Sequence, residues 1–380
     1  MRTVRVTVVA GLLVALHFST VGHAEAPPPP LATATRVQAP LRTFTFAAVG
    51  DWLSEGLVNN AAAAAAPPGV RYDHEPLLRA TAPLIQWADL AICHMETPIG
   101  TPGAKVGFIG RNAYGTSLIA APYELAGDLK RVGFDRCSTA SNHSNDLGNA
   151  GINSTLDALD AAGLSHTGTA RNPAEAGVDV FPVNGVQVAH MSYARNSNTG
   201  WPQESWRLDK ALTATKVVND VAAARASGAE VVIVSLHVFV EMQRAPTADD
   251  RALVQQITSQ ADVDLVVVHG PHVVQPFEQI NGTWVYWSLG NFISGMGVNG
   301  RNKYSDVRTL DGLMATARFT EQADGTWKVE PWTVLLCNVT GSRKVYPGVT
   351  MLQDPTISAT LRTQLEACVA RTVQVEARVH

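Results

Sequence analysis

Short apolar runs alternate with amphipathic segments along most of the chain. The run 230–236 is the most strand-like, and similar runs occur at residues 43–49, 88–93, 133–140, 265–268 and 284–289. Between these runs, apolar side chains recur with the spacing of one helix face. The predicted helices cover residues 74–87, 122–132, 152–162, 209–226, 249–261 and 356–369. Strands that alternate with helices predict an α/β fold with helices on the faces of the sheet.

Three local patterns add detail to this prediction. Asn184 and Gly185 separate two alternating runs, which predicts a β-hairpin at residues 178–191. Two late runs, at 314–319 and 327–336, resemble antiparallel strands. The alanine-rich stretch 61–66 is low in complexity and is followed by two prolines, so we expect a surface segment there.

The N-terminus has the features of a signal peptide. Two arginines precede an apolar run at 6–16, and small residues near Ala24 and Ala26 offer cleavage sites. The apolar run is shorter than the roughly 20 residues that span a membrane, so cleavage is favoured over retention as an anchor, and both stay open. We expect an exported protein, either secreted or associated with the cell envelope. The predicted parts are a signal peptide at 1–26, a proline-rich linker at 27–42, a main domain at 43–345 and a helical extension at 346–380.

Composition excludes some classes of function. Hydrophobic residues make up 46% of the 380 residues and charged residues 16%, which suits a globular core and argues against general disorder. The net charge is −4 and no basic stripe occurs, so nothing indicates nucleic-acid binding.

Export makes disulfide bonds possible for the four cysteines. Cys93 and Cys137 lie in apolar, strand-like runs, so we expect them to be free buried thiols. Cys337 and Cys368 lie in the C-terminal part, where we favour a bridge between them. The alternative is that Cys337 is unpaired in a strand.

Polar side chains follow several of the predicted strands where each strand ends. These residues are Asp51, Glu96, Asn142, His143, His237, His269 and His272. Any one of them alone is more typical of a cap, a core histidine or a solvated carboxylate. In open α/β sheets, however, ligands bind at the carboxyl ends of the strands. Their joint occurrence therefore predicts one site.

The residue types at these strand ends indicate a metal site. Carboxylates, an amide oxygen and imidazoles suit divalent ions such as Mn²⁺, Fe²⁺ or Zn²⁺ rather than a thiolate-bound structural zinc. A carboxylate shared between two ions would give a two-metal site of the kind that catalyses phosphoryl transfer.

The motifs also resemble a known family over residues 44–295. The segments that carry the resemblance are Gly50-Asp51, Ala88-Asp89-Leu90 leading to Glu96, Asn142-His143 with Asp146, Ser235-Leu236-His237 with Glu241, His269-Gly270-Pro271-His272, and Ser288-Leu289-Gly290-Asn291-Phe292. Together they look like the capsule-synthesis protein CapA family, which is named for poly-γ-glutamate capsule biosynthesis. The resemblance implies a calcineurin-like metallophosphatase fold, a layered sandwich of mixed β-sheets flanked by helices.

The resemblance also implies a set of metal ligands for two divalent ions. Asp51 and His272 would bind one ion. Asn142, His237 and His269 would bind the other, and Glu96 would bridge the two.

A second group of residues would act on the substrate. The resemblance implies that His143 faces the substrate and stabilises or protonates the leaving oxygen, while Asp146 holds its ring. Glu241 would contact the substrate, and Gly290 and Asn291 would approach a bound anion through backbone groups.

Three positions depart from the family pattern. The wider metallophosphatases carry Asp-x-His at the first strand, whereas here the third position is Leu53. The family commonly has Asn where this chain has His94, which is either a substitute ligand or a residue packed behind the ligands. Val238 and Phe239 replace the usual Trp-Gly pair, which puts the shape of the substrate in doubt.

Two functions follow as hypotheses. The first is an exported, metal-dependent hydrolase that makes or processes a capsule or envelope polymer, with an anionic polymer or a phosphate-containing substrate. Poly-γ-glutamate contains no phosphate, so chemistry on phosphate or on an amide stays open. The second is a non-catalytic, envelope-anchored binding or assembly component of a capsule polymer export complex, and a capsule-synthesis membrane complex is the expected partner. The sequence does not indicate the oligomeric state.

Overall fold

The computed structural model of the protein describes residues 41–297 and 303–376. The predicted signal peptide, and the predicted linker as far as residue 40, lie outside the described residues. No helix within the described ranges is long and apolar enough to cross a membrane.

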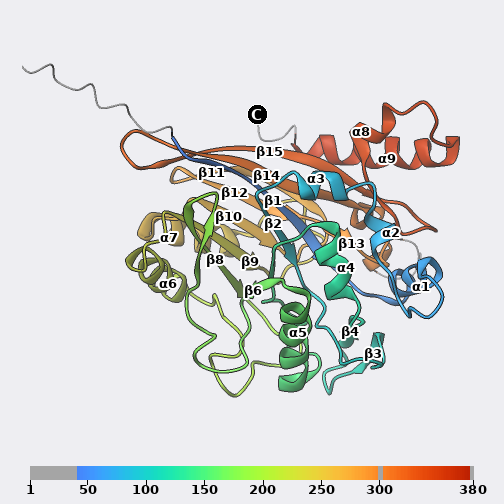
Figure 1. Cartoon of the computed structure of the whole chain (residues 1–380), viewed down its shortest axis with the longest axis horizontal. Coiled ribbons are helices and arrows are strands. Elements are labelled where there is room, and N and C mark those ends of the chain that lie inside the picture. Colours follow the sequence, from blue (N-terminus) through green and yellow to red (C-terminus); the bar gives the residue numbers. More distant parts are fainter. Residues whose placement is uncertain (1–40, 298–302, 377–380) are drawn as a thin grey trace, which may run out of the picture. The chain divides into compact units, whose positions relative to one another are not determined.

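The first of two large β-sheets combines parallel and antiparallel strands (Figure 1). Its strands are β1 (Thr43–Trp52), β2 (Leu90–His94), β5 (Arg136–Ser138), β6 (Ser165–Thr167), β13 (Asn291–Ile293), β14 (Asp311–Glu321), β15 (Trp327–Asn338) and β16 (Val345–Pro347). They follow the order β16-β15-β14-β1-β2-β5-β6, with β13 paired to β1. Within this sheet β1, β2, β5 and β6 run parallel to one another. β14 pairs with β1 in antiparallel fashion, and so do β15 with β14 and β16 with β15. The late antiparallel strands are therefore confirmed.

The second large sheet has a parallel centre and antiparallel edges. Its strands are β7 (Val180–Val183), β8 (Val186–Ala194), β9 (Val231–His237), β10 (Leu265–His269), β11 (Val274–Ile280) and β12 (Thr283–Leu289), in the order β11-β12-β10-β9-β8-β7. The predicted hairpin forms β7 and β8, and Asn184 and Gly185 in its turn have φ values of 48° and 78°. Such positive φ angles suit Asn and Gly in a two-residue turn. A separate hairpin, β3 (Gly107–Arg111) and β4 (Ser117–Ala120), was not predicted.

Alternating side chains pack the two sheets face to face. Phe46 and Ala48 of β1 share an apolar core with Ile233 of β9 and Val267 of β10. The intervening residue Ala47 points to the other face, where helices cover the first sheet. These helices are α1 (Gly56–Ala65), α2 (Glu75–Leu78), α3 (Ala82–Gln86), α4 (Leu125–Val132) and α5 (Gly148–Ala162).

Two helices, α6 (Ala214–Ala226) and α7 (Ala248–Gln260), cover the outer face of the second sheet. The layers are thus helix, sheet, sheet and helix, which confirms the predicted sandwich of mixed sheets flanked by helices (Figure 1). Short 3₁₀ turns at Lys303–Ser305 and Val307–Leu310 lead into β14.

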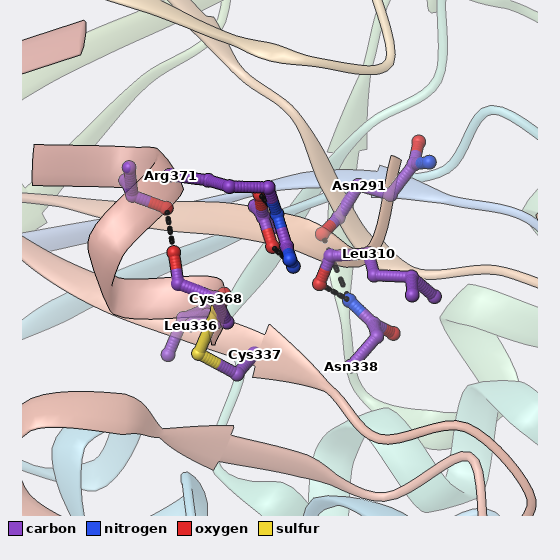
Figure 2. Close-up of a disulfide and its surroundings, with 9 residues drawn as sticks. Asn291, Leu310, Leu336, Cys337, Asn338, Cys368 and Arg371 are labelled. Carbon is purple, nitrogen blue, oxygen red and sulfur yellow. Dashed lines mark hydrogen bonds and ion pairs between the residues drawn. A yellow bond between two sulfur atoms is a disulfide. The ribbon is translucent and has the colours of Figure 1, made fainter. Parts of the chain in front are cut away.

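The C-terminal helices α8 (Gly348–Leu352) and α9 (Ala359–Glu376) pack against the first sheet, and α9 is also linked to it by a disulfide. Figure 2 shows the disulfide between Cys337 of β15 and Cys368 of α9, whose Cα atoms are 6.0 Å apart. The favoured bridge is therefore confirmed. Arg371 of α9 also donates two hydrogen bonds, of 2.7 and 2.6 Å, to the Asp311 carboxylate of β14.

The prediction of free thiols at Cys93 and Cys137 is wrong, because these two residues form a disulfide. They lie opposite each other in the parallel strands β2 and β5, with their Cα atoms 4.5 Å apart. The two apolar runs suggested burial correctly, but the pairing depends on which strands are neighbours.

Two local predictions concern the first helices of the chain. The single helix predicted at 74–87 is wrong, because α2 and α3 are separate helices. Pro83 lies in the first turn of α3, and a proline there cannot donate the hydrogen bond that would continue α2. The alanine-rich stretch 61–66 is partly exposed, although Ala62 is buried against the core, and residues 61–65 form the second half of α1 because alanine favours helices.

Candidate metal centre

The fold brings strand ends from both sheets together. Asp51 lies near the end of β1, His94 ends β2, His237 ends β9 and His269 ends β10. With two residues from the following turns they form a set that we call the Asp51 cluster. Its members are Asp51, His94, Glu96, His237, His269 and His272, and all six are buried.

Asp51 is the centre of this cluster. Its Oδ2 atom is 3.0 Å from Nδ1 of His272, and its Oδ1 atom is 3.6 Å from Nδ1 of His269. Two groups have possible ligand atoms that lie within 4.8 Å of one another: Asp51 with His94 and His269, and Asp51 with Glu96 and His272. The carboxylate common to both groups is therefore Asp51, whereas the family resemblance implies Glu96 as the bridge.

Several polar atoms in this region fit a bound cation. Both carboxylate oxygens of Glu96, Oδ1 of Asn142 and Nδ1 of His269 are buried and have no hydrogen-bond partner. Burying such acceptors without a donor costs free energy unless a positive charge lies nearby. Carboxylate, amide and imidazole donors are also the ligand types that suit Mn²⁺, Fe²⁺ and Zn²⁺. The residues present therefore fit a divalent metal ion.

His94 is a member of the Asp51 cluster. Its Nδ1 atom is 2.7 Å from Oγ of Ser138, which in turn donates to the carbonyl oxygen of Cys93. The Ser138 oxygen therefore accepts from Nδ1–H of His94, which leaves the Nε2 lone pair of His94 facing the cluster. Nε2 lies 3.0 Å from Nδ1 of His237 and 3.9 Å from Oδ1 of Asp51. It can orient His237 through a hydrogen bond or bind an ion directly.

Burial and charge divide the histidines into two kinds. Burial lowers the pKa of His237 to about 3, and the nearby Asp51 offsets only part of this effect. Burial, together with the neighbouring His269 and His237, also holds the pKa of His94 well below its usual value. Both rings are therefore neutral, as metal binding requires.

His272 differs because two carboxylates surround it. Burial acts to lower its pKa, but Glu96 and Asp51 outweigh burial and raise the pKa to about 10. Oδ1 of Asn291 lies 3.0 Å from Nδ1 of His272, and the Asn291 amide donates to the carbonyl oxygen of Thr309 at 3.0 Å. Asn291 thus fixes the His272 ring, with Nε2 3.7 Å from Oε1 of Glu96.

His143 and Asp146 form a hydrogen-bonded pair in the turn between β5 and α5. Nδ1 of His143 lies 2.6 Å from Oδ2 of Asp146, which also accepts the backbone N–H of Ile119 at 2.9 Å. The Asp146 side chain is fully buried, while that of His143 is 13% exposed. This pair therefore has a ring that faces outward and a carboxylate that orients it.

A cavity of about 840 Å³ lies against the cluster, and we call it the metal cavity. Asn142, His143, His272 and Glu241 line it. Gly290 does not, and its carbonyl oxygen accepts the backbone N–H of Asp51 at 3.0 Å. Gly290 and Asn291 are buried inside the protein, so their contacts favour a role in holding Asp51 and His272 over a contact with substrate.

Asn198 and Glu55 are among the residues of the metal cavity that were not predicted from the sequence. Asn198 lies in a loop after β8, and its Nδ2 atom is 3.3 Å from Nε2 of His143. No motif or strand end marks it. Glu55 lies four residues after Asp51 and accepts the backbone N–H of Gly295, and burial raises its pKa. Its position just beyond the first strand was the available signal.

Leu53 is buried and also lines the metal cavity. It packs with Ile119 and Met296 in a small apolar cluster. The position that carries histidine in the wider metallophosphatases is thus apolar here.

Several known proteins are similar to this chain. The family described as bacterial capsule synthesis protein PGA_cap matches residues 45–296. The PGA biosynthesis protein CapA of Bacillus subtilis (strain 168) is 26% identical over 205 residues, which are 53% of this chain and 52% of the relative. The capsule biosynthesis protein CapA of Bacillus anthracis is 26% identical over 237 residues, which are 60% of this chain and 56% of the relative. This chain therefore spans about half the length of these curated relatives.

Two solved structures are also similar. The calcineurin-like phosphoesterase YfkN from Bacillus subtilis has 12% identity and a TM-score of 0.49, over 88% of this chain and 99% of that chain. A 5'-nucleotidase precursor from Thermus thermophilus has 12% identity and a TM-score of 0.43, over 88% of this chain and 59% of that chain.

Proposed function

Because the chain belongs to the PGA_cap family of bacterial capsule synthesis proteins, we propose that it is a metal-dependent hydrolase that makes or processes a capsule or cell-envelope polymer. The relatives named above are described as capsule or PGA biosynthesis proteins. The hydrolase activity, the substrate and the partners are parts of the proposal.

One observation carries the proposal. Asp51 is shared by two groups of buried ligand atoms, and unpartnered acceptors on Glu96 and Asn142 lie in the same region. The metal cavity beside them also holds the outward-facing ring of His143. Metal ligands and a proton-carrying side chain thus meet at one cavity large enough for a substrate.

The metal ligands and the other residues of the cavity would have different roles in the reaction. Two divalent ions, when bound, would supply Lewis-acid activation of a phosphoryl or carbonyl oxygen and neutralise its developing charge. His143 would carry a proton at Nε2 for the leaving atom, and Asp146 would stabilise the charged ring through Nδ1–H. Asn198 would hydrogen-bond the substrate beside this ring.

Export forms part of the proposal. Two disulfides occur among the described residues, and such bonds persist mainly in oxidising compartments. The predicted signal peptide agrees with this location. An anionic polymer or a phosphate-containing envelope compound would then meet the metal cavity outside the cytoplasm, where a capsule-synthesis membrane complex would be the partner.

A second candidate function is non-catalytic. Leu53 makes one wall of the metal cavity apolar where the wider metallophosphatases carry a ligand. This departure favours a chain that keeps the metal for structure or for capture of a polymer, as part of an assembly complex. Tight metal binding without turnover of any substrate would support this candidate.

The test combines metal analysis with a screen for activity. We expect about two transition-metal ions per purified chain, and loss of metal in His237→Ala and Asn142→Ala. His166→Ala is the matched control, because His166 lies in β6 and pairs with Asp160, away from the cluster. Activity is then measured on phosphodiesters, phosphomonoesters and γ-glutamyl amides. Full metal content in both His237→Ala and Asn142→Ala would contradict the proposal.

A further inference from the structure

Exposed apolar side chains gather at the rim of the metal cavity. Phe239 is 67% exposed, Phe108 is 51% exposed and Leu57 is 40% exposed, and all three line the cavity that His143 and Asn142 also line. The cavity therefore combines a polar, ligand-rich part with an apolar rim.

Three separate segments supply this rim, so it is a product of the fold. Phe239 lies in the segment after β9, Phe108 in β3, and Leu57 in the first turn of α1. A Cβ atom on Gly107 would lie 3.4 Å from the backbone nitrogen of Gly56, so β3 and α1 approach closely at these glycines. Leu57 and Phe108, the residues that follow these two glycines, both line the metal cavity.

The three rim side chains contribute little to the stability of the fold. Side chains that stay half exposed gain only part of the hydrophobic free energy of burial. Exposed apolar patches on soluble proteins usually mark a site for a ligand or a partner. Here the patch is continuous with a cavity whose volume of about 840 Å³ is within the range of pockets that hold drug-sized ligands. A phosphoryl group alone would fill only a small part of it.

We propose that the metal cavity takes an amphiphilic phosphate ester, with its phosphoryl group at the Asp51 cluster and an apolar chain against Phe108, Phe239 and Leu57. This inference rests on the proposed function and names its substrate class. A hydrocarbon chain gains more free energy from contact with these three side chains than a strongly polar, anionic polymer does. A hydrocarbon chain that leaves the cavity along the rim buries all three.

The test measures how affinity depends on chain length. Ethyl-, butyl- and octylphosphonate bind like phosphate esters but contain a carbon–phosphorus bond that hydrolysis does not cleave. Their affinities for the full, Mn²⁺-loaded chain are measured by calorimetry. A fully buried methylene would tighten binding by about fourfold, and a half-exposed rim by roughly twofold. We therefore expect octylphosphonate to bind roughly 50-fold more tightly than ethylphosphonate.

Variants then locate the apolar contact. In Phe108→Ser combined with Phe239→Ser, we expect the octyl-to-ethyl affinity ratio to fall to less than fivefold. Both positions are exposed, so the variant should fold, and its metal content and melting temperature check this. Val373→Ser is the matched control, because Val373 is 47% exposed on α9 and does not line the metal cavity, and it should keep the wild-type ratio.

Three results would overturn the inference. If ethylphosphonate binds and octylphosphonate binds no better, the apolar contact is refuted and the proposed function stands. If no phosphonate binds to metal-loaded protein, phosphate chemistry fails as well. If the double variant keeps the octyl-to-ethyl ratio but loses binding to neutral lipid vesicles, the rim contacts a membrane surface and not a substrate chain.

Discussion

The replacement Asp146→Asn tests how His143 works. Oδ2 of Asp146 lies 2.6 Å from Nδ1 of His143 and is buried, so this hydrogen bond would strengthen when the ring takes up a proton during the reaction. Oδ2 also accepts the backbone N–H of Ile119, so an Asn oxygen in this position can still accept from both Ile119 and Nδ1–H of His143. The substitution therefore keeps the hydrogen bond but removes the negative charge that stabilises the charged form of the ring.

The magnitude follows from the type of interaction. A hydrogen bond to a charged group contributes about 1.5–3 kcal/mol and a neutral one about 0.5–1.5 kcal/mol, and each 1.36 kcal/mol in the barrier is about tenfold in rate. Asp146→Asn should therefore lower kcat by roughly tenfold. His143→Ala removes the proton donor itself and should cost roughly 10²- to 10⁴-fold. Neither change should lower the metal content.

The assay compares two phosphate esters that differ only in the leaving group. A nitrophenolate leaves without help from an acid, whereas an alkoxide needs a proton. We expect both variants to lose much more rate on an alkyl ester than on a nitrophenyl ester. An equal loss on both esters would refute the role of His143 as a proton donor, and a loss of metal would show that the pair acts on the ligands instead.

Three further predictions concern the cluster and its support. Replacing Cys93 and Cys137 by serine should lower the free energy of unfolding, measured by chemical denaturation, by about 4 kcal/mol, because the disulfide closes a loop with a sequence separation of 44. A loss below about 1 kcal/mol would contradict this prediction. Asn291→Ala should weaken metal binding by roughly 10- to 100-fold because it frees the His272 ring, and unchanged affinity in a chelator competition would contradict it. His94→Ala should weaken metal binding to a similar extent, and an unchanged affinity would mean that His94 only packs against the ligands.

Most of the cluster could be predicted because it lies at strand ends. An apolar run of four to seven residues ending in His237 or His269 indicates a buried strand and locates its last side chain. Parallel strands in both sheets then bring their carboxyl ends to one region, so the residues meet although Asp51 and His269 are far apart in the sequence.

The arrangement inside the cluster could not be predicted in the same way. Whether Asp51 or Glu96 is common to both ligand groups depends on side-chain directions to within a few ångströms, which periodicity does not encode. The hydrogen bond from His94 to Ser138 likewise depends on the register between β2 and β5. The same register decides the pairing of Cys93, which burial alone suggested to be a free thiol.

The positions of loop residues could not be predicted from the sequence for a different reason. Asn198 reaches the metal cavity from an irregular segment, and its position is set by long-range contacts. The backbone N–H of Asn198, for example, donates to the carbonyl oxygen of Asn142 at 2.9 Å, across 56 positions in the sequence. No local sequence pattern predicts such a contact.

The central claim is that the Asp51 cluster is a metal centre. Anomalous scattering from crystals of the purified protein, recorded at the absorption edges of Mn, Fe and Zn, tests it most directly. We predict two peaks, both within bonding distance of Asp51, one of them next to Glu96 and His272 and the other next to His269. Crystals of fully active protein with no anomalous peak at the cluster would contradict the claim.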